Sequence, residues 1–485
     1  MTRWNAGFTP TVLDTWATLL VDPERTERAA QGLGLLKGRR AQLEEILRIH
    51  KAVPAFQHTL RTLVAHGTEQ HRERAAAVAA WNATEAERLA AHLRLLGEEL
   101  AWIADRPGMS DAGLAVIKGF NNARFYTDPA PRWSRDVDVY VPDWAACRAV
   151  VTLLRERGYV FDEKECPWFK GEFARGRAEY GQLFLVRESG GWFSRVDIHF
   201  GTYSVGAGGY LDLPLTDFYE PVAQDLGYQG VNPTGTLLIM FAHALSDGYV
   251  SVKDVNDTVS LALTRTDVDF GRLGREIRRH SLEPQARVLA DQLSRLYRDE
   301  RITGLARELR RAAGGGRTGL WRMHDRDWHR RAAVNATHAF RSALRQRRGA
   351  LAATRRAVQC AVFYNRRLTV RVGERTWTQK LLLRLMARTD LTRWLLRPDA
   401  CPTMIHTAHP ALATVPVAGA GGRGRTASPS LMATSADGVR VGGAFPDRQL
   451  VSIGDDVFLC SWDQVVGRRQ VAQAKRIAEG GPGDD

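Results

Sequence analysis

Residues 134–142 read SRDVDVYVP, and this stretch decides the fold. From Asp136 to Val141 every second residue is a valine, which is the period of a β-strand. Side chains two apart in a strand point to the same side, so Asp136 and Asp138 are expected next to each other. Two negative carboxylates so close together repel each other unless a cation lies between them. Carboxylate oxygens are ligands that suit Mg²⁺. The alternative is an exposed strand edge without a ligand.

The segment before this strand contains a candidate phosphate-binding turn. Residues 113–120 (GLAVIKGF) form a short apolar run that predicts a buried strand, with a helix expected from Asn121 to Tyr126. Gly119 permits a tight turn and the close approach of a phosphate, and Lys118 supplies a positive charge. Free N–H groups at the start of the helix would add to this anion site. The alternative is a surface lysine before an ordinary turn.

The segment after the strand predicts a helix and then two paired strands. Residues 144–158 have helical spacing and end in glycine, while residues 177–189 and 192–201 read as strands. Gly190 and Gly191 would form the turn between the two strands. Strand, helix, strand, helix and a strand pair together predict a unit that mixes strands and helices.

Asp197 lies in an apolar strand, within RVDIHF (195–200). A charge in such a place needs a partner. The partner is either the metal ion held by the first two acids or a salt bridge to Arg195 or Arg135. His199 faces the same side as Asp197 because the two are two residues apart. It is either a neighbour of the metal or substrate, or a satisfied structural histidine.

The flanking regions are expected to be mostly helical. Thr84 is expected to cap the helix that follows it, and residues 376–398 have the spacing of another amphipathic helix. Short strands are expected from VRVGG, LVSIG and DVFLCSW near the end of the chain. The domain boundaries that follow are 1–108 (helical N-terminal region), 109–232 (core), 233–400 (helical region), 401–435 (flexible linker) and 436–485 (short β segment and tail).

A basic block occupies residues 301–370, with 17 arginines, no lysine and three acidic residues. The excess of positive charge in this block equals the net charge of the whole chain, +14. Such a block attracts phosphate polymers or nucleotides. The favoured alternative is a set of solvated helix faces, because arginine is a good helix former and no aromatic stacking pattern accompanies it.

The remaining composition excludes several classes of protein. The five cysteines are scattered without a C-x-x-C pair, so neither a zinc site nor a disulfide framework is expected. No run approaches the roughly 20 apolar residues of a membrane span. The first residues lack the basic then apolar layout of a signal peptide. We therefore expect a cytoplasmic protein that does not bind a membrane.

Taken together, these motifs resemble the bacterial family of uncharacterised nucleotidyltransferases in the DNA polymerase beta superfamily. The resemblance covers about residues 110–265 and rests on the order K-G, R-x-S-x-D-x-D, V-D-I-H and a later A-H-x-L helix. The matching residues are Lys118, Gly119, Arg132, Ser134, Asp136, Asp138, Asp197, His199, Ala242, His243 and Asp257.

The resemblance implies an α+β fold, with a small mixed sheet and flanking helices embedded between helical N- and C-terminal regions. It implies that Asp136, Asp138 and Asp197 are catalytic and bind two Mg²⁺ or Mn²⁺ ions. Lys118, Gly119, Arg132 and Ser134 would bind the nucleotide phosphates, with His199 beside the metal ligands.

Four residues within or near these motifs need separate comment. The family usually has a small residue after the turn glycine, whereas this chain has Phe120, which crowds the turn. His243 is expected to be a core histidine bonded to a neighbour such as Asp257. Asp254 and Asp257 are expected to be structural or capping residues.

The resulting prediction is a metal-dependent transfer of a nucleoside monophosphate from a nucleoside triphosphate, for example ATP, to a hydroxyl group. The acceptor would be a small molecule, a peptide or a protein. The alternative is an inactive binding protein that docks an acidic partner or nucleic acid through residues 301–370. A weaker alternative is a toxin that modifies transfer RNA. Nucleic acid is thus a less favoured partner.

Overall fold

The computed structural model describes most of residues 52–314 and shorter segments beyond them. Of the strands β4 and β9–β13, only the backbone is described. Gaps in the main described range fall at 107, 110–111, 130–131, 133, 163–167, 173–176, 190–191, 204–212, 223–227 and 248–249. Outside it the structure describes residues 44, 47, 328–345, 349–354, 357–358, 393–396, 433–435, 438–440, 449–453 and 456–461.

The chain divides into two compact units that interleave along the sequence. One is helical and the other is built around a sheet. The helical unit takes residues 1–100, 117–137 and 231–326, and the sheet unit takes residues 101–116, 138–230 and 327–485. The continuous domain boundaries drawn from the sequence remain predictions.

All described strands join one mixed sheet, in the order β12-β13-β9-β4-β5-β6-β2-β1-β8-β7, with β3 on β5 and the pair β10–β11 also attached to β5. Most neighbouring strands run antiparallel, and β1 runs parallel to β8. The bounds are β1 Ala115–Val116, β2 Val137–Val141, β3 Val160–Phe161, β4 Trp168–Glu172, β5 Arg177–Ser189, β6 Trp192–Gly201, β7 Tyr219–Pro221, β8 Gln229–Val231, β9 Arg393–Leu396, β10 Ala433–Ser435, β11 Gly438–Arg440, β12 Gln449–Ile453 and β13 Asp456–Ser461.

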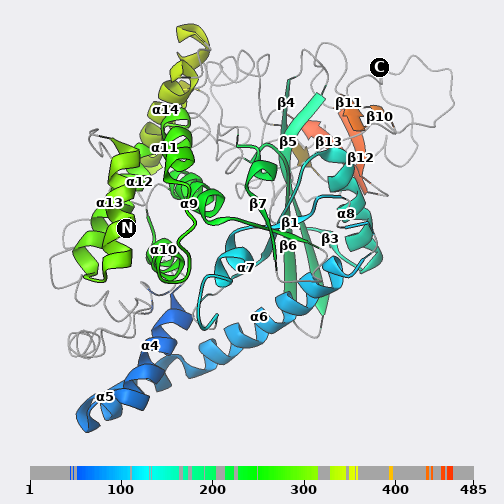
Figure 1. The fold of residues 1–485 in the computed structure, drawn as a ribbon. Helices are drawn as coiled ribbons and strands as arrows, with labels where there is room; N and C mark the ends of the chain where they lie inside the picture. Colours follow the sequence, from blue (N-terminus) through cyan, green and yellow to red (C-terminus); the bar gives the residue numbers. More distant parts are fainter. Residues whose placement is uncertain are drawn as a thin grey trace, which may run out of the picture. The chain divides into compact units, whose positions relative to one another are not determined.

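The two strands that carry the acidic residues lie side by side in the middle of the sheet. Every residue of β2 is buried, and so is β6 from Ser194 onward. Strands buried on both faces are typical of the centre of a sheet. One face is covered by α8 (Trp144–Glu156), which runs along the sheet in Figure 1 and packs Trp144 on Phe200 with ring centroids 5.0 Å apart.

The predicted strand pair is confirmed. β5 pairs antiparallel with the whole of β6, from Tyr180 opposite Gly201 to Ser189 opposite Trp192. The pairing leaves two residues, 190 and 191, for the turn, although these lie outside the described residues. This register fixes which side chains share a face: Gln182 lies opposite His199 and Phe184 opposite Asp197.

The helical unit consists of packed helices with apolar faces turned inward. Figure 1 shows α11, α12 and α13 side by side. The bounds are α4 Val53–His66, α5 Glu69–Ala79, η4 Ala80–Asn82, α6 Ala83–Ala104, α7 Lys118–Ala123, α9 Pro233–Asp247, α10 Val252–Thr264, α11 Phe270–Arg279, α12 Glu283–Leu296 and α13 Glu300–Ala313, with α6 running on into the sheet unit. In the sheet unit, α14 spans Trp328–Arg345. Mixed helix and sheet confirm the predicted α+β class.

Three local predictions need correction. The strand expected over 113–120 is limited to Ala115–Val116, and α7 begins three residues earlier than expected, at Lys118. Thr84 is the second residue of α6 and not the cap residue before it, because the 3₁₀ turn η4 leads directly into that helix.

The C-terminal part gives a mixed outcome. Within the helix expected over 376–398, residues 393–396 form strand β9, which pairs with β4 and β13, and the rest lies outside the described residues. β11, β12 and β13 confirm the three short strands expected near the end. The basic block is described only in part, as α13, α14 and the short helical stretch that follows. Among the described helices, none has the length and apolar character needed to cross a membrane.

Candidate active site

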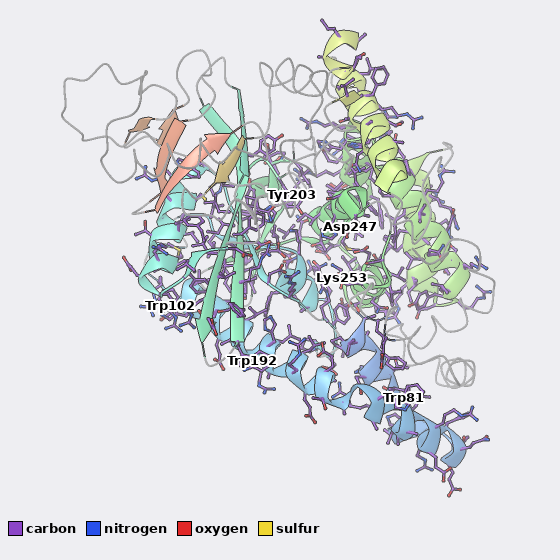
Figure 2. All side chains as sticks on the ribbon, turned by 180° about the vertical axis from the view of Figure 1, so that it is seen from behind. Trp81, Trp102, Trp192, Tyr203, Asp247 and Lys253 are labelled. Carbon is purple, nitrogen blue, oxygen red and sulfur yellow. The ribbon has the colours of Figure 1, made fainter. Side chains whose placement is uncertain are left out.

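Asp138, Asp197 and His199 lie on one face of the sheet. His199 Nε2 is 3.4 Å from Asp138 Oδ1, so the side chains of β6 and β2 meet here. Asp197 is two residues before His199 on a regular strand and therefore shares that face. Phe200, which packs on α8, points to the other face. Figure 2 labels Trp192, the first residue of β6, and Tyr203, two residues beyond its end. The Tyr203 ring lies 5.3 Å from that of His199.

Asp197 has formed the salt bridge that the sequence offered as an alternative. Arg195 donates from Nε to Asp197 Oδ1 at 2.6 Å and from Nη2 to Oδ2 at 3.0 Å. Gln182 Nε2 donates to the same Oδ2 at 3.2 Å. The guanidinium also lies over the Phe184 ring, 4.9 Å from its centroid, and 3.5 Å from Asp162. Arg195 is therefore held on three sides.

Asp136 directly precedes β2, two residues before the buried Asp138. The backbone there is fixed by Ser134, whose hydroxyl donates to the carbonyl oxygen of Asp136 at 2.7 Å. His92 Nε2 is 3.0 Å from the carbonyl oxygen of Arg135. These contacts stabilise the turn that leads into the strand. The bond from Ser134 to a phosphate stays a prediction. The hydrogen bond described above joins Ser134 to the backbone of Asp136.

The turn at Lys118 and Gly119 has an unusual backbone. Lys118 has a φ of 54°, in the left-handed region that non-glycine residues rarely adopt. Such strain costs about 1–3 kcal/mol and tends to occur at functional sites. Gly119 lies directly against Ser134: a Cβ added to it would be 2.1 Å from Ser134 Oγ. Glycine is needed here because Ser134 occupies the space of a side chain.

Replacing Gly119 by alanine is expected to destabilise the helical unit. The new methyl group would overlap Ser134 Oγ at 2.1 Å and Ser134 Cβ at 2.7 Å, so the turn must shift. Overpacking of this kind costs about 1–3 kcal/mol. The double variant Gly119→Ala/Ser134→Gly removes the overlap and should recover most of the loss. Urea unfolding of the three proteins measures both effects.

Gly304→Ala is the matched control, because a Cβ at Gly304 would meet nothing within 4 Å. Gly304 lies inside α13, where alanine is favoured over glycine by about 1 kcal/mol. This control should be neutral or stabilising. If Gly119→Ala is as stable as the wild type, Ser134 does not restrict the turn.

Arg132, which the resemblance assigns to phosphate, is buried in an ion pair. Its Nε lies 2.6 Å from Asp257 Oδ1, and the two side chains are 3% and 1% exposed. Burial opposes the charge and is the largest single influence, but Asp257 together with Tyr126 and Asp254 raises the pKa of Arg132 overall. The geometry gives Arg132 a structural role, and its contact with phosphate stays a prediction.

The same Asp257 ties α7 to α10. Asn122 Nδ2 donates to Asp257 Oδ2 at 2.7 Å, and Tyr126 OH donates to Oδ1 at 2.8 Å. Burial first, and then the negative Asp257, raise the pKa of the Tyr126 phenol, so it stays a donor. Asn121 adds bonds to the backbone of Val231, donating at 3.1 Å and accepting at 2.8 Å. This buried network fixes the helix that begins with Lys118 and Gly119.

Two expectations about neighbouring residues can now be settled. His243 is not bonded to Asp257: its Nδ1 lies 3.3 Å from Asp247, one turn along α9, and its side chain is 25% exposed. Figure 2 labels Asp247 near the end of that helix. Asp254 and Asp257 are structural, as expected. Asp254 forms a capping box with Ser251 at the start of α10.

The donor set fits a divalent cation only in part. Asp138 is a buried carboxylate beside an imidazole, and carboxylate oxygens are ligands that suit Mg²⁺. Asp197 does not fit in this arrangement, since Arg195 occupies both of its oxygens. Accordingly, the part of the chain that the structure describes contains no group of three or more His, Cys, Asp or Glu side chains arranged to hold a metal ion.

Comparison with known families gives one match. A family model described as an uncharacterised nucleotidyltransferase matches residues 49–298, just over half of the chain. The matched range extends beyond residues 110–265, where the sequence motifs lie, at both ends. It includes strands β2 and β6 and the helices from α4 to α12. No curated protein and no solved structure matches the chain.

Proposed function

Because the chain belongs to this family of uncharacterised nucleotidyltransferases, we propose that it moves a nucleoside monophosphate from a nucleoside triphosphate to a hydroxyl group. The acceptor is a small molecule, a peptide or a protein. The reaction depends on Mg²⁺ or Mn²⁺, held by Asp136 and Asp138.

One observation carries the proposal. Asp138 and Asp197 lie on neighbouring buried strands and on the same face, with His199 touching Asp138. Buried carboxylates are expensive unless a cation or donors neutralise them. A sheet that is built only for stability has no need of two of them on one face. The opposite face, which packs on α8, carries the apolar side chains of Val196, Ile198 and Phe200.

The residues of the chain then have separate tasks. Lys118 neutralises phosphate charge, and Gly119 lets the backbone approach the phosphates. Ser134 holds the backbone of Asp136 in place through its bond to the carbonyl oxygen. His199 restrains the carboxylate of Asp138. Asp197 faces the same side and orients the acceptor hydroxyl. The bound cation, when present, offsets the charge of the triphosphate and of the leaving pyrophosphate.

The test is an incubation of the purified protein with each nucleoside triphosphate, labelled at the α-phosphate, in Mg²⁺ or Mn²⁺. We expect release of pyrophosphate, with transfer of label to the protein or to an added hydroxyl acceptor. Omission of the metal should abolish both. Pyrophosphate release at the same rate in EDTA would contradict the proposal.

A further inference from the structure

The stretch of chain from Gly119 to Ser134 leaves one point of the helical unit and returns to it. Its two ends touch, since a Cβ added to Gly119 would be 2.1 Å from Ser134 Oγ. Lys118, which we propose to neutralise phosphate charge, directly precedes this stretch, and Asp136 follows it by two residues. All four residues belong to the helical unit. The contacts that hold the stretch therefore decide how Lys118 is placed relative to Asp136.

Asp257 is bound by both halves of this stretch. From the first half, Asn122 Nδ2 donates to Asp257 Oδ2 at 2.7 Å and Tyr126 OH donates to Oδ1 at 2.8 Å. From the second half, Arg132 Nε lies 2.6 Å from the same Oδ1. One carboxylate thus joins three separate points of the stretch, two residues short of its return at Ser134.

Helix α10 holds Asp257 in a fixed place. The capping box of Ser251 and Asp254 secures the first turn of the helix. At its last residue, the Thr264 hydroxyl donates to the carbonyl oxygen of Phe125 at 3.0 Å, which is a further bond between α10 and the stretch. A side chain that is locked in this way can fix the geometry of the residues bound to it.

The arrangement depends on the negative charge of Asp257. The side chains of Arg132 and Asp257 are 3% and 1% exposed, so water cannot replace either partner. In Asp257→Asn one of the two oxygens becomes an NH₂ group, which cannot accept a hydrogen bond. At least one of the three contacts is then lost, and Arg132 is left as an uncompensated buried charge. The two halves of the stretch would move relative to each other.

We infer that Asp257 is a positioning residue for nucleotide binding, which fixes the turn at Lys118 and Gly119 relative to the segment that leads to Asp136. The inference rests on the proposed function, because it takes Lys118 to bind phosphate. Asp257 is buried and acts through Lys118. Its role therefore goes beyond the stability of the helical unit, because a shift of about 1 Å in a binding group far from the chemistry is enough to weaken it strongly.

A double-mutant cycle of nucleotide affinity tests this coupling. The dissociation constant of a non-hydrolysable nucleoside triphosphate analogue is measured with Mn²⁺ for the full-length wild type, Lys118→Met, Asp257→Asn and the double variant. We expect each single variant to bind roughly tenfold more weakly than the wild type. The double variant should lie within about threefold of either single variant, because a misplaced lysine has little left to lose.

Leu289→Ala is the matched control for lost stability. Leu289 lies on α12 and is 1% exposed, so its truncation leaves a cavity in the core of the same unit. At a temperature where circular dichroism shows every variant to be folded, this control should bind the analogue with the wild-type dissociation constant. A loss of affinity in Leu289→Ala equal to that in Asp257→Asn would overturn the inference, because reduced stability alone would explain both.

The other outcomes separate the inference from the proposed function. Wild-type affinity in Asp257→Asn would overturn the inference alone, and so would a roughly hundredfold loss in the double variant, since additive effects mean independent residues. Failure of the wild type to bind the analogue would overturn the proposed function and the inference with it.

Tyr126→Phe decides if Asp257→Asn does not fold. It removes one donor to Asp257 and keeps the ion pair with Arg132. We expect roughly threefold weaker binding, and no further loss when it is added to Lys118→Met. Unchanged affinity in Tyr126→Phe would overturn the inference.

Discussion

Asp138→Asn is expected to reduce pyrophosphate release by roughly a thousandfold or more, which corresponds to about 4 kcal/mol of lost transition-state stabilisation. The amide keeps the size of the side chain and its contact with His199, but it removes the negative charge that binds the cation. The fold should survive, since a neutral group is easier to bury than a carboxylate. Rates of pyrophosphate release with saturating triphosphate measure the effect.

Asp143→Asn is the matched control. Asp143 is exposed and caps α8 by accepting from the N–H of Ala146. Asparagine caps a helix as well as aspartate does, so this variant loses one negative charge without loss of structure. It should retain the wild-type rate. Equal activity of the wild type and Asp138→Asn would show that the reaction does not take place at the sheet face that carries Asp138 and Asp197.

Arg132→Met should cause the largest loss of stability. The substitution leaves the carboxylate of Asp257 buried without its cation, and breaking one partner of such a pair costs about 3–5 kcal/mol. Asn122 and Tyr126 still donate to Asp257, but they carry no charge. The free energy of unfolding in urea, compared with that of the wild type, measures the loss.

An exposed pair in the same unit provides the control. Arg88 and Glu85 form a salt bridge at 2.7 Å with side chains that are 56% and 45% exposed. Arg88→Met should therefore cost less than about 1 kcal/mol, because water replaces the lost partner. The double variant Arg132→Met/Asp257→Asn should lose less than the sum of its single variants. A loss of under 1 kcal/mol for Arg132→Met would mean that the pair does not hold the segment after α7 to α10.

Sequence periodicity predicted the elements that carry the site because their patterns are local. The valines between Asp136 and Val141 indicate β2, and the apolar stretch around Asp197 indicates β6. The spacing of residues 144–158 predicts α8, which ends at Glu156. Alternation along a strand also predicts that Asp197 and His199 share a face. The contact between His199 and Asp138 adds that this face includes Asp138.

Such local patterns could not predict contacts between residues that are far apart in the chain. Arg132 and Asp257 are 125 positions apart, and neither spacing nor composition indicates that one neutralises the other. Arg195 was named as a partner of Asp197, but the sequence could not choose between it and a metal ion. The left-handed backbone of Lys118 could not be predicted from its residue type, because residues other than glycine rarely adopt it. Residues 393–396 form strand β9 although their spacing is helical, because pairing with β4 and β13 outweighs the local preference.

The most direct test of the proposed site is to measure whether nucleotide binding depends on a metal ion. This measurement needs no knowledge of the acceptor. The dissociation constant of a non-hydrolysable triphosphate analogue is measured by calorimetry with Mn²⁺ and again with EDTA. We expect binding at least roughly tenfold tighter with Mn²⁺, equal to about 1.4 kcal/mol. This difference should disappear in Asp138→Asn and persist in Asp143→Asn. The same dissociation constant in Mn²⁺ and in EDTA would contradict a cation held by Asp136 and Asp138.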